Sequence, residues 1–324
     1  MAAAAELAGR LEEQLARIIA GNERTTLAFL IALLGRGHIL IEGVPGTAKT
    51  LFVRMFAALL GVDFRRIQFT PDLMPSDVVG TTVFNPKSAE FALRRGPIFT
   101  NLLLADEINR TPPKTQSALL EAMEERQVTI DGETQALDPF FVVCATQNPI
   151  EFEGTYPLPE AQLDRFFVRA TTSYPAAAQE KELLARSAAG FDAQHLDSAG
   201  VTQVATREDV LAAQREVRTI FVAPALQDYL YAVVARTRAS KDLALGASPR
   251  AAIALLVATQ AAAAIEGREF ATPDDLKSVA PLVLPHRLIV RPEAEVEGIS
   301  AATVLDRILA TVDVPKGLSL AKPV

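Results

Sequence analysis

Short apolar runs alternate with segments of helical periodicity through the first half of the chain. Four of the apolar runs have the length and composition of buried strands, and they span residues 38–42, 64–69, 101–107 and 140–148. The segment that follows the first run, residues 51–60, carries its apolar positions at helical spacing. An alternation of strands and helices is typical of an α/β fold with a mainly parallel sheet.

Two other segments predict β-hairpins. Residues 81–84 and 90–93 are short runs of strand-forming residues on either side of a polar turn. Residues 128–134 contain an Asp-Gly pair, which is a strong short-range signal for a tight hairpin turn. In the first hairpin Phe84 and Phe91 alternate with polar residues, so they either pack on each other or face a partner.

The N-terminal residues predict an amphipathic helix that packs on the core. Its apolar face is formed by Leu7, Leu11, Leu15 and Ile18. Three acids, Glu6, Glu12 and Glu13, interrupt this segment, which argues against a signal peptide. Residues 27–34 are too few to span a membrane and residues 251–265 contain polar positions, so we expect two buried helices and no membrane span.

After Tyr174 the alternation gives way to helical patterns alone. One helical face collects five apolar residues, Leu226, Tyr229, Leu230, Val233 and Val234. Ser248-Pro249 and Thr272 have the features of helix N-termini. We therefore predict two domains, an α/β core over residues 1–174 and a smaller all-α domain over residues 175–324.

Composition narrows the range of functions. The chain has 324 residues, 49% of them hydrophobic, so a sizeable core is available. Its net charge is −7, which disfavours a general nucleic-acid binder because such affinity comes from clustered Lys and Arg. Three widely spaced histidines give no metal-ligand pattern. The one cysteine, Cys144, lies in a predicted core strand and fits a protein of the reducing cytoplasm.

A phosphate-binding loop follows the first predicted strand. Its eight residues are Gly43, Val44, Pro45, Gly46, Thr47, Ala48, Lys49 and Thr50. Strand, glycine-rich loop, Lys-Thr and helix form the context in which backbone N–H groups cradle phosphates. Lys49 would reach the β- and γ-phosphates, and the Thr50 hydroxyl would ligate Mg²⁺. The alternative is a turn with no ligand.

Two other predicted strands end in polar residues at the same edge of the sheet. Asp106 is suited to holding Mg²⁺, and Glu107 is suited to orienting a water for attack on the γ-phosphate. Asn148 can bridge this water or the phosphate to the acids. The alternatives are two solvated acids, and an Asn that only caps the following turn.

Three segments together resemble the MoxR family of AAA+ ATPases. They read GVPGTAKT (43–50), LLLADEINRTPPKTQSALLEAMEERQVTIDGE (102–133) and ATQNPIEFEGTYPLPEAQLDRF (145–166). The resemblance covers about residues 18–174 and continues more loosely beyond. It implies an AAA+ core with a five-stranded sheet, a helical lid, ATP and Mg²⁺ as ligands, and a homo-oligomeric ring, commonly a hexamer. It also implies that residues 18–22 line the adenine pocket, although a buried apolar turn would look identical.

The resemblance assigns roles to individual residues. Lys49 and Thr50 bind phosphate and Mg²⁺, Asp106 and Glu107 are the Walker B acids, and Asn148 is sensor 1. Arg165 stands at the arginine-finger position and Arg250 at the sensor 2 position. Ala48 replaces a glycine found in many such loops, and this small residue is accommodated.

The two arginines also have a chemical rationale. Phosphoryl transfer needs positive charge near the γ-phosphate, and an arginine there accelerates it by orders of magnitude. We expect Arg165 to lie far from its own subunit's nucleotide and to serve a neighbour, and Arg250 to contact the γ-phosphate from the lid. The alternatives are that Arg165 pairs locally with Asp164 or Glu160, and that Arg250 is solvated.

The resemblance implies ATP-driven, chaperone-like maturation of protein complexes, often with metal or cofactor insertion. Partner proteins with von Willebrand factor A domains are implied as well, whereas the client is not indicated. Three other functions stay open at this point: a nucleic-acid motor, a metal-chelatase motor subunit, and a scaffold that binds nucleotide and barely hydrolyses it.

Overall fold

The computed structural model describes residues 3–18, 23–44, 49–87, 89–148, 154–172, 174, 176–188 and 200–315. Its centre is a parallel five-stranded sheet, which confirms the predicted fold class. In spatial order the strands are β2 (Phe64–Gln68), β5 (Leu102–Asp106), β8 (Val142–Gln147), β1 (Ile39–Gly43) and β9 (Val168–Thr172). The sequence analysis located the first four of these strands and missed β9.

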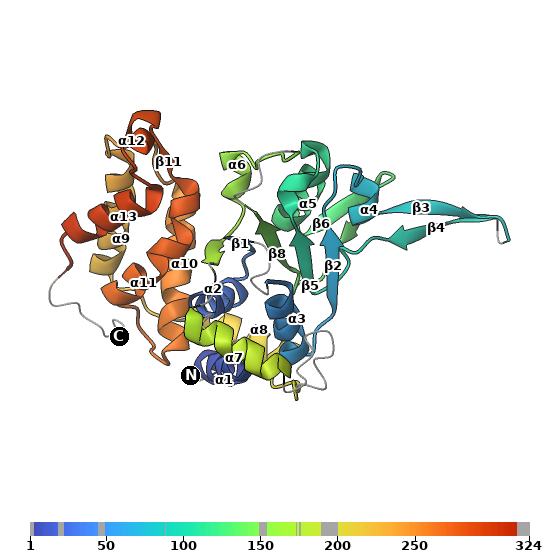
Figure 1. The fold of residues 1–324 in the computed structure, drawn as a ribbon, viewed down its shortest axis with the longest axis horizontal. Coiled ribbons are helices and arrows are strands. Elements are labelled where there is room, and N and C mark those ends of the chain that lie inside the picture. The colour runs from blue at the N-terminus through green and yellow to red at the C-terminus, as the bar shows by residue number, and fades with distance from the viewer. Residues whose placement is uncertain are drawn as a thin grey trace.

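Helices cover both faces of the sheet (Figure 1). The described helices up to residue 217 are α1 (Ala3–Ile18), α2 (Glu23–Leu34), α3 (Lys49–Leu60), α4 (Pro75–Val79), α5 (Pro113–Glu125), α6 (Glu160–Leu163), α7 (Ala177–Ala188) and α8 (Arg207–Val217). A 3₁₀ turn, η1 (Ile108–Arg110), lies between β5 and α5. Alternate residues of a strand point to opposite faces. Leu102 and Leu104 of β5 therefore join the apolar cluster with α1–α3, and Leu103 and Ala105 join the cluster with α5.

Both predicted hairpins are present. β3 (Gly80–Asn85) pairs with β4 (Glu90–Arg95), and β6 (Gln127–Ile130) pairs with β7 (Glu133–Ala136). The first hairpin projects from the body of the molecule (Figure 1). Phe84 and Phe91 lie opposite each other on it with ring centroids 5.2 Å apart, and they remain 49% and 74% exposed. The two aromatic rings therefore pack together and still face outward.

The C-terminal region is helical apart from one short strand pair. Its elements are α9 (Pro224–Arg238), β10 (Leu243–Leu245), α10 (Pro249–Ile265), α11 (Pro273–Val283), the 3₁₀ turn η3 (Pro285–Arg287), β11 (Ile289–Val290), α12 (Pro292–Val296) and α13 (Ala301–Thr311). Ser248 caps α10, and Thr272 forms a capping box at α11, as predicted. The expectation of helices alone is wrong in detail, because β10 pairs with β11.

The predicted domain boundary after Tyr174 stays a prediction, and α8 bears on it. This helix packs against α1 and α2. Glu216 near its end accepts a hydrogen bond from the backbone N–H of Ala3 at 2.9 Å, and Gln214 donates to the Leu33 carbonyl at 2.7 Å. The contacts of α8 thus tie it to the core helices. No described helix is long and apolar enough to cross a membrane.

His38, the buried residue before β1, forms hydrogen bonds to α5 and β8. His38 Nε2 donates to the Met123 carbonyl at 3.0 Å, and Nδ1 accepts from the Val143 N–H at 3.0 Å. The ring is neutral in this arrangement, since one nitrogen donates and the other accepts. Burial, together with the nearby charge of Arg126, lowers the pKa of His38 to about 3 from 6.5.

This pKa shift predicts how stability depends on pH. The unfolded chain binds a proton at His38 below about pH 6.5, whereas the folded chain resists it until about pH 3. The contribution of neutral His38 to the free energy of unfolding should therefore be complete above pH 6.5. It should decrease as the pH falls from 6.5 to 3, by at most about 1.4 kcal/mol per pH unit. Gln can make both hydrogen bonds without titrating. Urea denaturation at several pH values should show a shallower loss for His38→Gln; an unchanged slope would contradict this account.

Candidate active site

The predicted phosphate-binding loop begins at Gly43, where β1 pairs with β9. The packing at Gly43 leaves no space for a side chain, because a Cβ there would lie 2.1 Å from Thr172 Oγ1. The predictions for Pro45, Gly46, Thr47 and Ala48 fall outside the described residues, as do those for residues 19–22 and the Ile18 side chain. Val44 is described and half-buried.

Lys49 and Thr50 form the first residues of α3. Lys49 Nζ donates to the Gly43 carbonyl at 2.6 Å, so the ammonium group lies at the carboxyl end of β1. Burial lowers the pKa of Lys49, and the negative charges of Asp106 and Glu107 oppose that shift. The ammonium is thus partly dehydrated and lies in the field of both acids, which is the setting a phosphate-binding lysine needs.

Thr146 of β8 ties the two acids together. Its hydroxyl donates to Asp106 Oδ1 at 2.5 Å and accepts from the Glu107 backbone N–H at 2.9 Å. The other oxygen of Asp106 accepts from Arg66 of β2, at 2.7 Å from Nη2 and 3.1 Å from Nε. Asp106 at the end of β5 is therefore fixed from the strands on both of its sides.

Glu107 has an unusual backbone conformation. Its φ of 57° and ψ of 50° lie in the left-handed region, which residues other than glycine seldom adopt. Such conformations cluster at functional sites. Its Oε2 accepts from Gln68 Nε2 at 2.7 Å and pairs with Arg110 Nε at 3.0 Å. The side chain predicted to orient the water is thus held in place by β2 and η1.

Asn148 follows the last residue of β8 and is only 5% exposed. β8 lies between β1 and β5, so Asn148 emerges at the edge where Lys49, Asp106 and Glu107 also lie.

Mg²⁺ in nucleotide sites is held by one or two protein oxygens plus phosphates. The Thr50 hydroxyl and the Asp106 carboxylate at this edge are donors of that kind.

Arg165 and Arg250 share one carboxylate. Arg165 Nε lies 3.1 Å from Glu124 Oε2, and Arg250 Nη1 lies 3.0 Å from Glu124 Oε1. Glu124 is in the last turn of α5. Asp164, one of the local partners considered for Arg165, pairs with Arg287 instead. The guanidinium groups predicted as finger and sensor 2 thus form one cluster.

This cluster lies at the other edge of the sheet from Lys49. The Phe167 N–H donates to the His38 carbonyl at 2.9 Å, at the amino end of β1, and Met123 contacts the His38 ring. Lys49 contacts Gly43, at the carboxyl end of β1. A five-residue strand is about 16 Å long. This differs from the expectation that Lys49 and Arg250 bind the phosphates of one subunit. The reason is that the C-terminal region from α9 to α13, here called the lid, docks at the amino edge.

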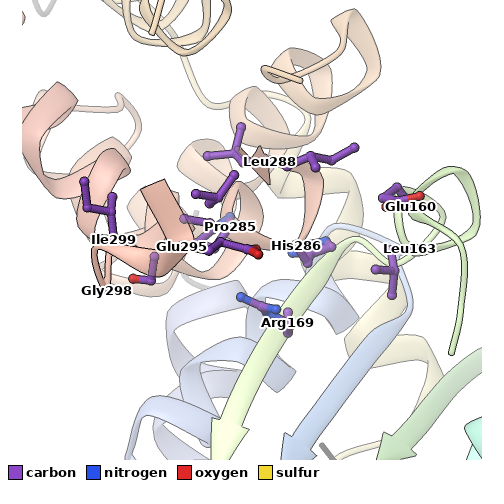
Figure 2. Close-up of a pocket in the computed structure, with 13 residues that line it drawn as sticks. Glu160, Leu163, Arg169, Pro285, His286, Leu288, Glu295, Gly298 and Ile299 are labelled. Carbon is purple, nitrogen blue, oxygen red and sulfur yellow. The ribbon is translucent and has the colours of Figure 1, made fainter. Parts of the chain in front are cut away.

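A cavity of about 580 Å³ is lined by residues of the lid, of α6 and of β9 (Figure 2). The residues that line it include Glu160, Leu163, Arg169, His286, Glu295 and Ile299. These residues belong to the amino edge as well, since Arg169 is near the start of β9. The cavity is therefore distinct from the carboxyl edge that holds Lys49 and the acids.

Comparisons with known proteins identify the family. The model for the ATPase family associated with various cellular activities (AAA) matches residues 38–168, and the AAA lid domain model matches residues 235–308. The uncharacterized protein YeaC of Bacillus subtilis is 47% identical, with 95% of both chains covered. Chaperone MoxR1 of Mycobacterium tuberculosis is 44% identical over 93% of this chain and 80% of its own length. Protein MoxR of Paracoccus denitrificans is 31% identical over 94% of this chain and 95% of its own.

The chain belongs to the MoxR family of AAA+ ATPases. The crystal structure of a proposed ATPase from Cytophaga hutchinsonii agrees, with a TM-score of 0.87, 40% identity and 97% of both chains covered. The resemblance stated from the sequence is thus confirmed, and so are the fold class and the ATPase activity. As a member of the MoxR family, the protein binds nucleotide through its AAA core.

The sequence analysis missed several residues of this MoxR-family site. Gln68, Arg66, Arg110 and Thr146 contact the two acids, and Glu124 holds the two arginines. The polar residues on the predicted strand 64–69 gave one signal, since that strand neighbours the acidic one. The partners of Glu124 left no local signal, because Arg250 lies 126 positions away in the chain.

Proposed function

We propose that this ATPase hydrolyses ATP with Mg²⁺ at sites shared between neighbouring copies in a homo-oligomeric ring, a hexamer. The observation that carries the proposal is the separation of the two halves of the site. Lys49 and the acids lie at the carboxyl edge of the sheet, whereas Arg165 and Arg250 lie at the amino edge. In this arrangement the arginines serve the neighbour's nucleotide, which changes the predicted role of Arg250 from its own subunit's site to the next.

Within one site the residues divide the work. Lys49 binds the β- and γ-phosphates, and Thr50 and Asp106 are positioned to hold Mg²⁺, which when bound neutralises phosphate charge. Glu107 orients the attacking water and accepts its proton. Asn148 positions the water or the γ-phosphate. Thr146 holds the Asp106 carboxylate and the Glu107 backbone in place through its hydroxyl group. The arginines stabilise the charge that develops on the phosphoryl oxygens.

Several ion pairs and hydrogen bonds must be exchanged when ATP binds. Lys49 has to leave the Gly43 carbonyl for phosphate, and Asp106 has to release part of its contact with Arg66. At the far edge, Arg165 and Arg250 have to trade Glu124 for the neighbour's phosphate. Each exchange replaces one polar or charged partner by another. When no neighbouring subunit is present, Glu124 is the partner of both arginines.

A mixed-subunit assay tests the shared site. Lys49→Ala should remove phosphate binding but leave the arginines intact, and Arg165→Ala should do the reverse. Neither variant alone should turn over ATP. In an equal mixture, about one site in four would combine an intact loop with an intact finger if subunits mix at random in a closed ring. ATPase activity should therefore return to roughly a quarter of the wild-type value.

The control for this assay is assembly, measured by light scattering for each variant with wild-type subunits. If each variant assembles with the wild type and the mixture stays inactive, the shared site is wrong.

We propose further that the ring performs chaperone-like remodelling of partner protein complexes. The relative Chaperone MoxR1 carries this activity in its name, and the β3–β4 hairpin offers exposed Phe84 and Phe91 as a surface that could grip a client. A von Willebrand factor A-domain partner, metal or cofactor insertion, and a cytoplasmic location belong to the same proposal. The net charge of −7 argues against the nucleic-acid motor.

A further inference from the structure

One buried arginine fastens the lid to the chain segment that carries the finger. Arg287 of η3 is 7% exposed, and a guanidinium group has five N–H donors. The fold supplies five acceptors for them. Four belong to the core: Asp164 Oδ1 at 2.6 Å and the carbonyls of Phe166, Phe167 and Asp164 at 2.6, 3.1 and 3.3 Å. The fifth is the Val283 carbonyl of the lid.

The residues that Arg287 contacts flank Arg165 on both sides. Asp164 precedes the finger, and Phe166 follows it. His286 Nε2 also lies 3.0 Å from the Phe166 carbonyl, so two successive lid residues hold the same peptide group. The segment 164–167 thus has its course fixed from the lid by η3 and from the core by His38.

The same contacts reach Arg250. The second carboxylate oxygen of Asp164 accepts from the Ser248 hydroxyl at 3.3 Å, and Ser248 is the N-cap of α10. Arg250 stands in the first turn of that helix. Asp164 therefore links Arg287 to the helix start that presents Arg250, while its chain neighbour Arg165 meets Arg250 at Glu124.

This arrangement requires arginine. A lysine ammonium has three donors on a flexible stem and cannot match five acceptors arranged around a planar group. Burial lowers the pKa of Arg287, whereas the hydrogen bond and charge of Asp164 raise it. The charge of Asp164 and its hydrogen bond thus offset the cost of burying the Arg287 guanidinium. Truncating Arg287 would leave several buried carbonyls without a hydrogen-bond partner.

We propose that Arg287 is a positioning residue for catalysis in the neighbouring subunit: it sets the placement of Arg165 and Arg250 as a pair. The proposal rests on the shared site proposed above. The buried Arg287 guanidinium donates to five protein acceptors, so it acts through the segment 164–167 and the start of α10.

The first test compares Arg287→Lys with a matched control, Arg291→Lys. Arg291 is an exposed arginine of the same lid whose Nε donates to the lid carbonyl of Leu243. Arg287→Lys should lower kcat by about 10²-fold, the effect expected when a catalytic group is displaced by about 1 Å. Its Kd for a fluorescent ATP analogue should be unchanged, because Lys49 supplies the ground-state phosphate contact and the arginines act on the charge that develops in the transition state. Arg291→Lys should match the wild type in both values.

The decisive measurement tells whether Arg287→Lys impairs the nucleotide site of its own subunit or that of the neighbouring subunit. Arg287→Lys mixed with Lys49→Ala should regain ATPase activity, because the Lys49→Ala subunits contribute intact arginines to intact loops. Arg287→Lys mixed with Arg165→Ala should gain nothing, since both are defective at the same edge. If Arg287 only stabilised the fold of its subunit, the loss of activity would not depend in this way on which variant is mixed with Arg287→Lys.

The outcomes separate the two proposals. If Lys49→Ala with Arg165→Ala recovers activity but Lys49→Ala with Arg287→Lys does not, the role of Arg287 is overturned and the shared site stands. If neither mixture recovers, the shared site itself fails. An unchanged kcat for Arg287→Lys would also overturn the role.

Folding is monitored by thermal unfolding and by assembly with wild-type subunits. Should Arg287→Lys fail to fold, Asp164→Asn tests the same contact from the core side. This change keeps an acceptor for Arg287 Nε, removes the negative charge, and replaces the acceptor of the Ser248 hydroxyl by an N–H donor. It should give the same recovery with Lys49→Ala, and failure to recover would count against the proposal.

Discussion

Replacing Glu107 by Gln should lower kcat for ATP hydrolysis by about 10²- to 10⁴-fold, the range for loss of a general base. An amide cannot take the proton of the attacking water. The substitution keeps the size of the side chain, and its amide can still meet Gln68 and Arg110, so binding of ATP should persist. Phosphate release measures turnover, and calorimetry measures the Kd of ATP.

The matched control for this prediction is Glu121→Gln, a change at an exposed acid of α5. It should leave both kcat and Kd unaltered. A Glu107→Gln protein that turns over ATP at the wild-type rate would exclude Glu107 as the base.

The same variant should stall on its client and allow it to be captured. Adding Phe91→Ser, which removes the more exposed ring of the β3–β4 hairpin, should reduce the amount captured while leaving ATP binding intact. Equal capture by the two proteins would remove the hairpin from the client surface.

Loss of the proposed arginine finger should have an effect of similar size. We expect Arg165→Ala to lower kcat by about 10³-fold or more, the magnitude associated with arginine fingers. Arg165→Lys should restore only part of it, because a point charge lacks the planar fork that matches phosphate. The Kd of ATP should change little, since Lys49 still binds the phosphates and the proposed finger stabilises charge that develops only in the transition state.

Arg250→Ala should be less severe, and the double variant should be little worse than Arg165→Ala. Residues that act as a unit give non-additive effects, and these two share Glu124. Arg17→Ala is the control, because Arg17 forms an exposed pair with Glu13 on α1 and such pairs contribute little. Strictly additive losses would show that the two arginines act independently.

Much of the fold was predictable because its signals are local. Four apolar runs predicted β1, β2, β5 and β8 to within two residues at each end, and the Asp-Gly turn predicted β6–β7. Lys49 and the two acids fell at one edge because strands joined by helices have to run parallel. Thr272 predicted the start of α11 through its capping box.

The missed features depend on contacts between distant parts of the chain. β9 contains Arg169 and shows no alternation strong enough to mark it; it becomes a strand by pairing with β1. The placement of Arg250 depends on how the lid docks, which no local pattern encodes. Arg287 did leave a signal, because a His-Arg pair within the apolar run 282–290 implies a buried charge that needs partners.

In the proposed ring, the opposite placement of Lys49 and Arg165 gives each protomer two different contact surfaces. Copies that complete one another's sites have to join head to tail, so the two contacting surfaces differ, and only a suitable rotation per subunit closes the series instead of extending it into a filament. A solitary chain would then possess every residue of the catalytic apparatus and yet no finished site. Dilution below the dissociation constant of the assembly should silence each molecule without altering its own structure.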